Sequence, residues 1–168
     1  MSRPALFLDR DGVLNVDHGY VSRPADFEPV DGIFDALRPA VEHGVALIVV
    51  TNQSGIGRGY FSQQQYDALE NHIAGLFASN GCPLTATYHC PHLPDAGCSC
   101  RKPKPGMILR AASEYDIDLD RSAMVGDKTS DIDAARNAGI TRTERIDSAS
   151  ASPDALARAV AWIIEAEQ

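Results

Sequence analysis

Short apolar runs alternate along this chain with segments in which apolar residues recur every three or four positions. The composition typical of strands is found at residues 5–9, 45–51, 84–89, 122–126 and 140–146. Helical spacing begins near residues 31, 62, 105, 129 and 153. This alternation predicts an α/β fold, namely a doubly wound, Rossmann-like parallel sheet with helices on both faces.

The ends of the predicted helices carry their own signals. Asp31 is expected to be the N-cap of the first helix, which Gly44 ends. Residues 62–65, Ser-Gln-Gln-Gln, form a capping box that opens the second helix. Ser152, followed by Pro153, is expected to cap the last helix. The irregular segments 12–28 and 90–104 are the only material left to cover a site, so we expect a minimal cap.

Composition narrows the class of protein. The length of 168 residues and the hydrophobic content of 44% fit one compact domain over residues 1–168. A formal net charge of -8 leaves no general basic surface for nucleic acid or anionic lipid. The longest apolar run, residues 45–50, is too short to cross a membrane, and no secretory signal precedes the first strand. We therefore expect a cytoplasmic, monomeric protein without nucleic-acid or membrane partners.

Two carboxylates follow the first predicted strand, at the edge where open parallel sheets bind their ligands. Asp9 and Asp11 lie two residues apart, and alternation along a strand points both side chains to the same side. Carboxylates this close favour a cation between them, and magnesium prefers such hard oxygen ligands. By itself, Asp-x-Asp-Gly also occurs in ordinary turns and calcium loops, so the pattern needs support from the rest of the chain.

Three further motifs fall at the same edge. They are Thr-Asn-Gln-Ser-Gly at 51–55, Arg-Lys-Pro-Lys-Pro-Gly at 101–106 and Gly-Asp-Lys-Thr-Ser-Asp at 126–131. Hydroxyl, amide and backbone N–H groups are suited to phosphate oxygens. Each motif alone is more often a loop, a solvated face or a turn, but their common position predicts a magnesium and phosphate site. The cations expected to make this cleft positive within an acidic chain are Arg10, Arg58, Arg101, Lys102, Lys104 and Lys128.

In this order the motifs resemble the haloacid dehalogenase superfamily of phosphotransferases over essentially the whole chain. They are similar in particular to its small histidinol-phosphate and heptose-bisphosphate phosphatases. The resemblance implies covalent catalysis, in which Asp9 attacks phosphorus while Asp11 serves as general acid and then as general base. It also implies Mg²⁺ held by the carboxylates of Asp9 and Asp127 and the backbone carbonyl of Asp11. Asp131 is a weaker candidate for the outer shell of the metal.

The resemblance implies the substrate contacts as well. Thr51 and Lys102 would stabilise the charge of the transferring phosphoryl group. Arg101 and Lys128 would bind a second phosphate, through a planar guanidinium and a point charge respectively. The positions implied for the sugar are Asp17, His18, Gly19, Tyr20, Asn52, Gln53 and Ser54.

Four potential zinc ligands lie within eleven residues, namely Cys90, His92, Cys98 and Cys100. Three thiolates and one imidazole suit a closed tetrahedral Zn²⁺ site with no open position for chemistry. This segment has too few apolar residues to fold by packing, which favours a bound metal. Cys82 lies apart and is expected to be a core thiol. Only five residues separate His92 from Cys98, fewer than in the zinc loops of the similar phosphatases.

Three functions stay open on the sequence alone. Residues 14–21 and the cations at 101 and 128 favour a phosphatase of a phosphorylated heptose sugar in lipopolysaccharide biosynthesis. A histidinol-phosphate phosphatase would use the same chemistry on another substrate. A phospho-acceptor signalling domain also holds magnesium near an acidic pair, but its acceptor follows a later strand and it needs no zinc loop.

Overall fold

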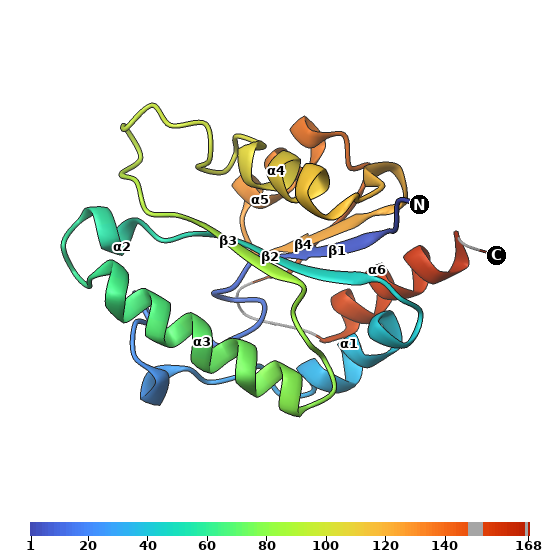
Figure 1. Ribbon diagram of the computed structural model, residues 1–168, viewed down its shortest axis with the longest axis horizontal. Helices are drawn as coiled ribbons and strands as arrows, with labels where there is room; N and C mark the ends of the chain where they lie inside the picture. The colour runs from blue at the N-terminus through green and yellow to red at the C-terminus, as the bar shows by residue number, and fades with distance from the viewer. Residues whose placement is uncertain (148–152, 167) are drawn as a thin grey trace.

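The computed structural model describes residues 1–147, 153–166 and 168. A parallel sheet with the strand order β3-β2-β1-β4-β5 forms its centre (Figure 1). Every pair of neighbouring strands is parallel, so each connection has to cross over one face of the sheet. The strands are β1 (Ala5–Leu8), β2 (Ala46–Asn52), β3 (Ala86–Cys90), β4 (Ala123–Gly126) and β5 (Arg142–Arg145).

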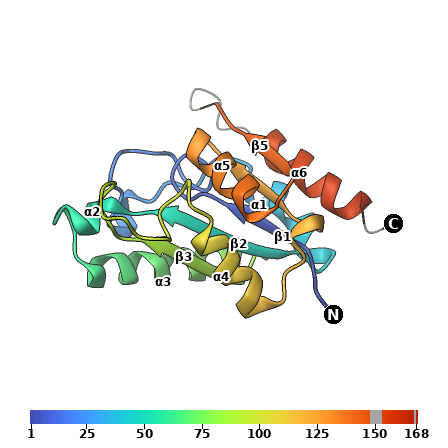
Figure 2. The same ribbon diagram turned by 90° about the horizontal axis from the view of Figure 1, so that it is seen from above.

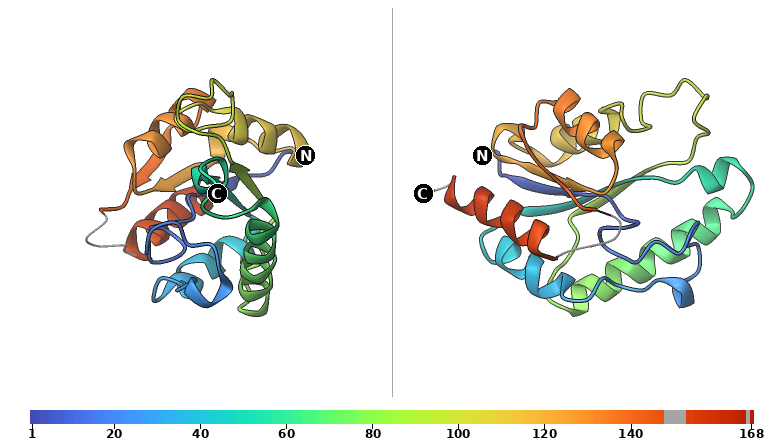
Figure 3. Two further views of the ribbon diagram at one scale, coloured as in Figure 1. Left: turned by 90° about the vertical axis from the view of Figure 1, so that its left-hand side faces the viewer. Right: turned by 180° about the vertical axis from the view of Figure 1, so that it is seen from behind.

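Helices cover both faces of the sheet, which confirms the predicted fold class. Figures 1 and 3 show α1, α3 and α6 on one face, and α4 and α5 on the other. Side chains of β1 alternate accordingly, because Leu6 and Leu8 join the first core and Phe7 joins the second. The helices are α1 (Ile33–Glu42), α2 (Ser54–Gly57), α3 (Gln63–Ser79), α4 (Gly106–Tyr115), α5 (Thr129–Ala138) and α6 (Pro153–Glu165), with short 3₁₀ turns at Pro24–Asp26 and Leu119–Arg121.

Local signals predicted some helix ends correctly and others wrongly. The capping box is present, since Ser62 Oγ accepts from the Gln65 N–H at 3.1 Å and Gln65 Oε1 accepts from the Ser62 N–H at 2.8 Å. Asp31, however, does not cap α1, which begins one residue later than expected because Gly32 is its N-cap with a φ of 79°. The short α2 was not predicted. The predicted cap at Ser152 lies outside the described residues.

All five strands differ by one or two residues from their predicted extents, β3 and β5 most clearly. β3 begins at Ala86 and includes Cys90, so the first potential zinc ligand is part of the sheet. β5 covers only Arg142–Arg145, inside the predicted 140–146, because it is a partly exposed edge strand. Among the described residues, no helix is both long and apolar enough to cross a membrane.

The sheet brings the predicted motifs to one edge. The carboxyl ends of β1, β2 and β4 meet where α2 and the loop of residues 91–104 extend from the molecule, at the left of Figure 1 and again at the left of Figure 2. In parallel sheets this edge carries the ligand site.

Candidate active site

Asp9 and Asp127 lie beside one another at the carboxyl ends of β1 and β4. The Asp9 N–H donates to the carbonyl of Val125 at 3.1 Å, so the turn after β1 is tied to the neighbouring strand. Asp131, in the first turn of α5, completes a group in which one carboxylate oxygen of each residue lies within 4.8 Å of the others. We call these three residues the carboxylate cluster. Asp127 Oδ1 is buried without a hydrogen-bond partner, as suits an oxygen that binds a cation.

Gly12 permits the close approach of Asp127 to the first motif. Its φ of +83° lies in the left-handed region that glycine adopts most easily. A Cβ at this position would lie 2.3 Å from Asp127 Oδ2, and no side chain fits into that space. The glycine that follows the two aspartates is therefore required by both the backbone and the site.

Lys102 is buried at the centre of the carboxylate cluster. Its Nζ lies 2.8 Å from Asp9 Oδ1 and 2.6 Å from Asp131 Oδ1, and it donates to the carbonyl of Val50 at 2.7 Å. Burial lowers the pKa of Lys102, but the charges of Asp9 and Asp131 outweigh this effect, so its pKa is raised and it stays protonated. The loop of the third motif therefore supplies a fixed cation to the end of β1.

Burial perturbs the acidity of Asp9 and Asp127. Burial raises the pKa of Asp9 to about 7, although Lys102 acts in the opposite direction. Burial also raises the pKa of Asp127, with the charge of Asp131 adding to the effect. Buried acids that resist ionisation without a cation are typical of functional sites. The second oxygen of Asp131 accepts the backbone N–H of Lys128 at 3.0 Å, which leaves Asp131 fewer lone pairs for a metal.

The Thr-Asn-Gln segment of residues 51–53, at the carboxyl end of β2, supports these groups. The side chain of Asn52 donates to the carbonyl of Lys102 at 3.2 Å and accepts its N–H at 3.1 Å, so Asn52 fixes the position of the buried lysine. Gln53 Nε2 donates to Thr51 Oγ1 at 2.9 Å and to Asp11 Oδ2 at 3.1 Å. Two residues predicted to touch the sugar therefore also hold other site residues in place.

Asp11 is turned toward a set of hydrogen-bond donors. Arg10 Nη2 lies 3.0 Å and 3.1 Å from its two oxygens, Asn15 Nδ2 donates at 3.1 Å, and Gln53 donates to it as described. Arg10 was predicted to add positive potential to the cleft, but it is buried and does not line it. The sequence carried one signal for this pairing, because Arg10 directly precedes Asp11.

A cleft of about 780 Å³ opens above this edge of the sheet. Asp9 and Thr51 lie below its surface, 5% and 1% exposed. His18 does not line this cleft. It lines a neighbouring hollow, where its Nε2 lies 2.7 Å from Glu28 Oε2. The predicted residues that do line the cleft are Asp11, Asp17, Gly19, Tyr20, Asn52, Gln53, Ser54, Arg101, Lys102 and Lys128.

The four potential zinc ligands also come together, and we call Cys90, His92, Cys98 and Cys100 the cysteine cluster. One ligand atom of each lies within 4.8 Å of the others. Cys90 Sγ is 3.6 Å from Cys98 Sγ and 3.0 Å from Cys100 Sγ, and His92 Nδ1 is 3.3 Å from Cys90 Sγ. Thiolates around a tetrahedral zinc ion with bonds of ~2.3 Å lie ~3.8 Å apart. Burial alone would raise the pKa of the Cys98 thiol. Hydrogen bonds to its sulfur, above all from the Arg101 N–H, outweigh this effect and lower its pKa to about 6, which favours the thiolate that binds metal.

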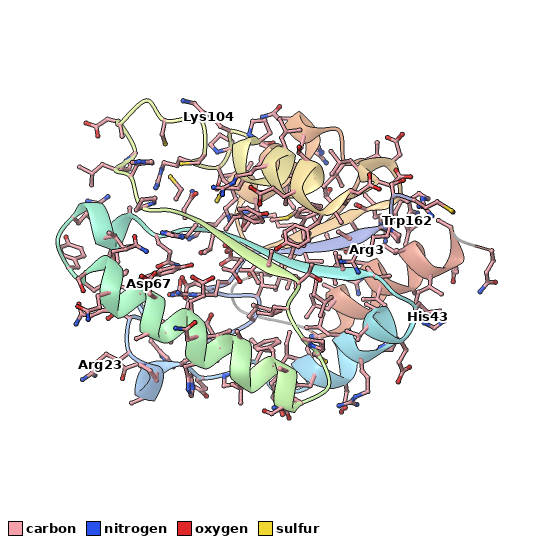
Figure 4. The ribbon with its side chains drawn as sticks, viewed as in Figure 1. Arg3, Arg23, His43, Asp67, Lys104 and Trp162 are labelled. Carbon is pink, nitrogen blue, oxygen red and sulfur yellow. The ribbon has the colours of Figure 1, made fainter. Side chains whose placement is uncertain are left out.

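The loop that carries the cysteine cluster is held close to the cleft. A Cβ on Gly57 of α2 would lie 2.6 Å from the carbonyl of Pro91, and the Gly57 N–H donates to that carbonyl at 3.0 Å. Lys104, labelled at the top of Figure 4, donates from Nζ to the carbonyl of Cys98 at 2.6 Å. Arg101 directly follows Cys100, so the position of the cluster determines where this cation enters the cleft.

Comparisons with known proteins agree with this geometry. A model of the HAD-hydrolase-like family matches residues 99–161. A Vibrio cholerae protein named D-glycero-β-D-manno-heptose-1,7-bisphosphate 7-phosphatase is 47% identical over 147 residues, which are 83% of this chain and 79% of the relative. The name of this relative agrees with the sugar-bisphosphate hypothesis rather than with a histidinol-phosphate phosphatase or a signalling domain.

Solved structures show the same fold. A HAD-like phosphatase from Mesorhizobium loti superimposes with a TM-score of 0.82 at 33% identity, over 98% of this chain and 87% of the other. The D,D-heptose 1,7-bisphosphate phosphatase from B. bronchiseptica, solved with magnesium and phosphate, superimposes with a TM-score of 0.79 at 30% identity. The match covers 98% of this chain and 99% of that one.

Proposed function

The chain belongs to the haloacid-dehalogenase-like hydrolases, and we propose that it removes the 7-phosphate of D-glycero-D-manno-heptose 1,7-bisphosphate. This activity would contribute to the heptose supply of lipopolysaccharide biosynthesis. The observation that carries the proposal is the position of Asp9, which is buried beside Asp127 and within 2.8 Å of the Lys102 ammonium at the cleft. The named relatives, 47% identical over most of the chain, support the choice of substrate.

In the proposed first step, the Asp9 carboxylate attacks the phosphorus. The bond from phosphorus to the sugar oxygen breaks, its electron pair passes to that oxygen, and Asp11 supplies the proton. In the second step Asp11 removes a proton from water, whose oxygen attacks phosphorus and releases Asp9. Lys102 and Thr51 would stabilise the negative charge of the phosphoryl group in both steps. Phosphate and the sugar monophosphate leave.

Mg²⁺ fits the carboxylate cluster as it stands. The carboxylates of Asp9 and Asp127 and the backbone carbonyl of Asp11 would hold it, and the unpartnered Asp127 Oδ1 supports this assignment. When bound, the ion would neutralise charge on the phosphate and on the aspartates. Asp131 would act through Lys102 and the start of α5 rather than as a ligand, since both of its oxygens already have partners.

The rest of the substrate would lie along the cleft. Arg101 and Lys128 would bind the phosphate that is not removed, and the loop of residues 17–20 would contact the sugar. His18 belongs to this proposal only if it leaves Glu28. Zn²⁺ in the cysteine cluster would have a structural role, because the four protein ligands would leave no open coordination position for a water molecule or substrate. Its effect would be to position Arg101.

Phosphate release is the direct test. Both anomers of heptose 1,7-bisphosphate and histidinol phosphate would be offered to the wild-type enzyme with magnesium, and kcat/KM compared. We expect kcat/KM for heptose 1,7-bisphosphate, in its preferred anomer, to exceed that for histidinol phosphate by a hundredfold or more. A preference for histidinol phosphate would contradict the substrate but not the chemistry.

A pair of variants separates the second-phosphate contact from general electrostatics. Arg101→Ala should raise KM for the bisphosphate about tenfold or more while changing turnover of p-nitrophenyl phosphate little, because that substrate has no second phosphate. Arg110→Ala is the matched control, since Arg110 is exposed on α4 and paired with Glu114. Equal effects of the two variants would contradict the assignment of Arg101.

A further inference from the structure

Arg10, which lies between Asp9 and Asp11 in the sequence, is buried, with 2% of its surface exposed. Its Nη2 lies 3.0 Å from Asp11 Oδ1 and 3.1 Å from Asp11 Oδ2, while Nε lies 3.3 Å from Oδ1. The same Nη2 donates to the carbonyl of Val21 at 2.9 Å. A guanidinium has a planar, fixed set of donors, so these contacts constrain both the angle and the position of the carboxylate.

Helix α3 lies near Arg10. Tyr66 and Glu70 of α3 line a small hollow together with Arg10, and Tyr66 is hydrogen-bonded to Glu70. A buried cation is costly unless it is paired, and Asp11 is the carboxylate in direct contact with it. Of the two partners, Asp11 is 18% exposed at its side chain and lines the cleft, so the constraint is applied where a substrate would bind.

The contact with Val21 extends the constraint to the substrate loop. Val21 is 3% exposed and directly follows Gly19 and Tyr20, which line the cleft. Tyr20 has a φ of 48°, a conformation that a non-glycine residue keeps only when its surroundings hold it. One guanidinium therefore joins Asp11 to the loop proposed to hold the sugar.

We propose that Arg10 is a positioning residue that fixes the Asp11 carboxylate and the 17–21 loop relative to one another. It thereby places the oxygen of the departing sugar against Asp11. This inference rests on the proposed function, specifically on Asp11 as the group that transfers the proton. Arg10 does not line the cleft, so its removal should lower kcat only in steps that need Asp11, whereas a displaced 17–21 loop would raise KM for the sugar bisphosphate.

Two substrates distinguish this role from a general structural one. The sugar alcohol of heptose 1,7-bisphosphate needs a proton to leave, whereas p-nitrophenolate leaves without one. Arg10→Ala should lower kcat for the bisphosphate about 10²-fold or more, in the range typical of general acid–base catalysis. With p-nitrophenyl phosphate the first turnover should stay fast and later ones slow. A burst of one p-nitrophenol per enzyme should therefore be seen.

A double-mutant cycle gives the decisive readout. In an Asp11→Asn background, Arg10→Ala should cost less than about threefold further, because it acts through a group already removed. Arg10→Lys should lie between wild type and Arg10→Ala, since an ammonium cannot reproduce the planar donor set. If Arg10→Ala does not fold, the cycle is run with Arg10→Lys. Arg23→Ala is the matched control, because Arg23 is a surface residue of the following loop and pairs only with Asp26 among the described contacts (Figure 4).

Two outcomes would overturn the inference while the wild-type enzyme hydrolyses heptose bisphosphate. One is a double variant whose loss in kcat equals the product of the losses in the Arg10 and Asp11 single variants, which would mean that the two residues act independently. The other is an equal loss in the first turnover of both substrates. Wild-type protein that hydrolyses neither substrate would instead contradict the proposed function itself, so the two failures can be told apart.

Discussion

The carboxylate cluster and the cysteine cluster lie at the same edge of the sheet, yet different parts of the fold support them. The carboxylates follow β1 and β4 or begin α5, and Lys102 already neutralises part of their charge. In the cysteine cluster only Cys90 belongs to a strand and is buried, while His92 is exposed and the other two are partly exposed. The first cluster is held by the packed sheet, and the second lies mostly on a loop.

This difference separates chemistry from folding. Lys102 compensates part of the carboxylate charge, and strands and helices of the packed sheet carry the three aspartates, so a bound metal adds reactivity more than structure. A loop with few apolar residues gains its order from the ion that its ligands share, so a bound metal adds stability. We therefore expect changes in the carboxylate cluster to act first on turnover, and changes in the cysteine cluster to act first on unfolding.

Asp9→Asn should have the largest effect of all. Removing the nucleophile should lower turnover of the sugar bisphosphate by at least ~10⁴-fold, as losses of catalytic nucleophiles do. The melting temperature should stay within a few degrees of wild type, because Lys102 keeps its contacts with Asp131 and Val50. Phosphate release and thermal denaturation measure the two. Asp35→Asn, at an exposed ion pair on α1, is the control, and turnover by Asp9→Asn within tenfold of wild type would refute the role.

Lys102→Met should lower both turnover and stability, unlike the other changes in the carboxylate cluster. The variant loses a donor to the phosphoryl group, which costs about 10²- to 10³-fold in rate. It also leaves Asp9 and Asp131 buried without their cation, and breaking a buried pair costs about 3–5 kcal/mol. Steady-state kinetics and denaturant unfolding would show this. Arg23→Met removes an exposed cation outside the site and should leave stability nearly unchanged; a stable Lys102→Met protein would contradict the argument.

Removing zinc from the cysteine cluster should act mainly on stability. If free zinc exceeds its Kd a thousandfold, binding stabilises the fold by about 4 kcal/mol. Its removal should then lower the melting temperature by roughly 8–16 °C for a chain of this size. Cys100→Ser should reproduce the loss, while Cys82→Ser, outside the cluster, should not. An unchanged melting curve after zinc removal would exclude a structural site, and magnesium removal should stop turnover with little change in melting.

The last prediction concerns the dependence of stability on pH. Because burial raises the pKa of Asp9 from 3.8 to about 7, the metal-free folded state keeps a proton that the unfolded chain releases. Asp9 therefore favours folding most below about pH 4, and this contribution is lost as the pH rises to 7. Without magnesium, the melting temperature of wild type should fall between pH 4 and 7 relative to that of Asp9→Asn. Parallel pH curves for the two proteins would contradict the raised pKa.

Patterns that depend on neighbours in the sequence could be read from the chain. The alternation of strands and helices, the capping box at Ser62 and the order of the motifs all follow from local periodicity, and the structure agrees with them. Features that depend on a partner far along the chain could not be read in this way. Asp31 has the right residue type for an N-cap, but α1 begins after Gly32, whose φ is 79°. His18 has the right chemistry for a ligand, but Glu28 pairs with it.

The sequence by itself determined which chemical groups this protein has and, through strand order, that they meet at one edge of a sheet. Only the tertiary structure decided how each group is used there. Arg10 and Lys102 are both cations of the predicted cleft, yet Arg10 is buried against Asp11 and Lys102 between Asp9 and Asp131. The reason is physical, since a buried charge needs a partner at hydrogen-bond distance, and for Lys102 only the folded chain brings Asp9 from 93 residues away.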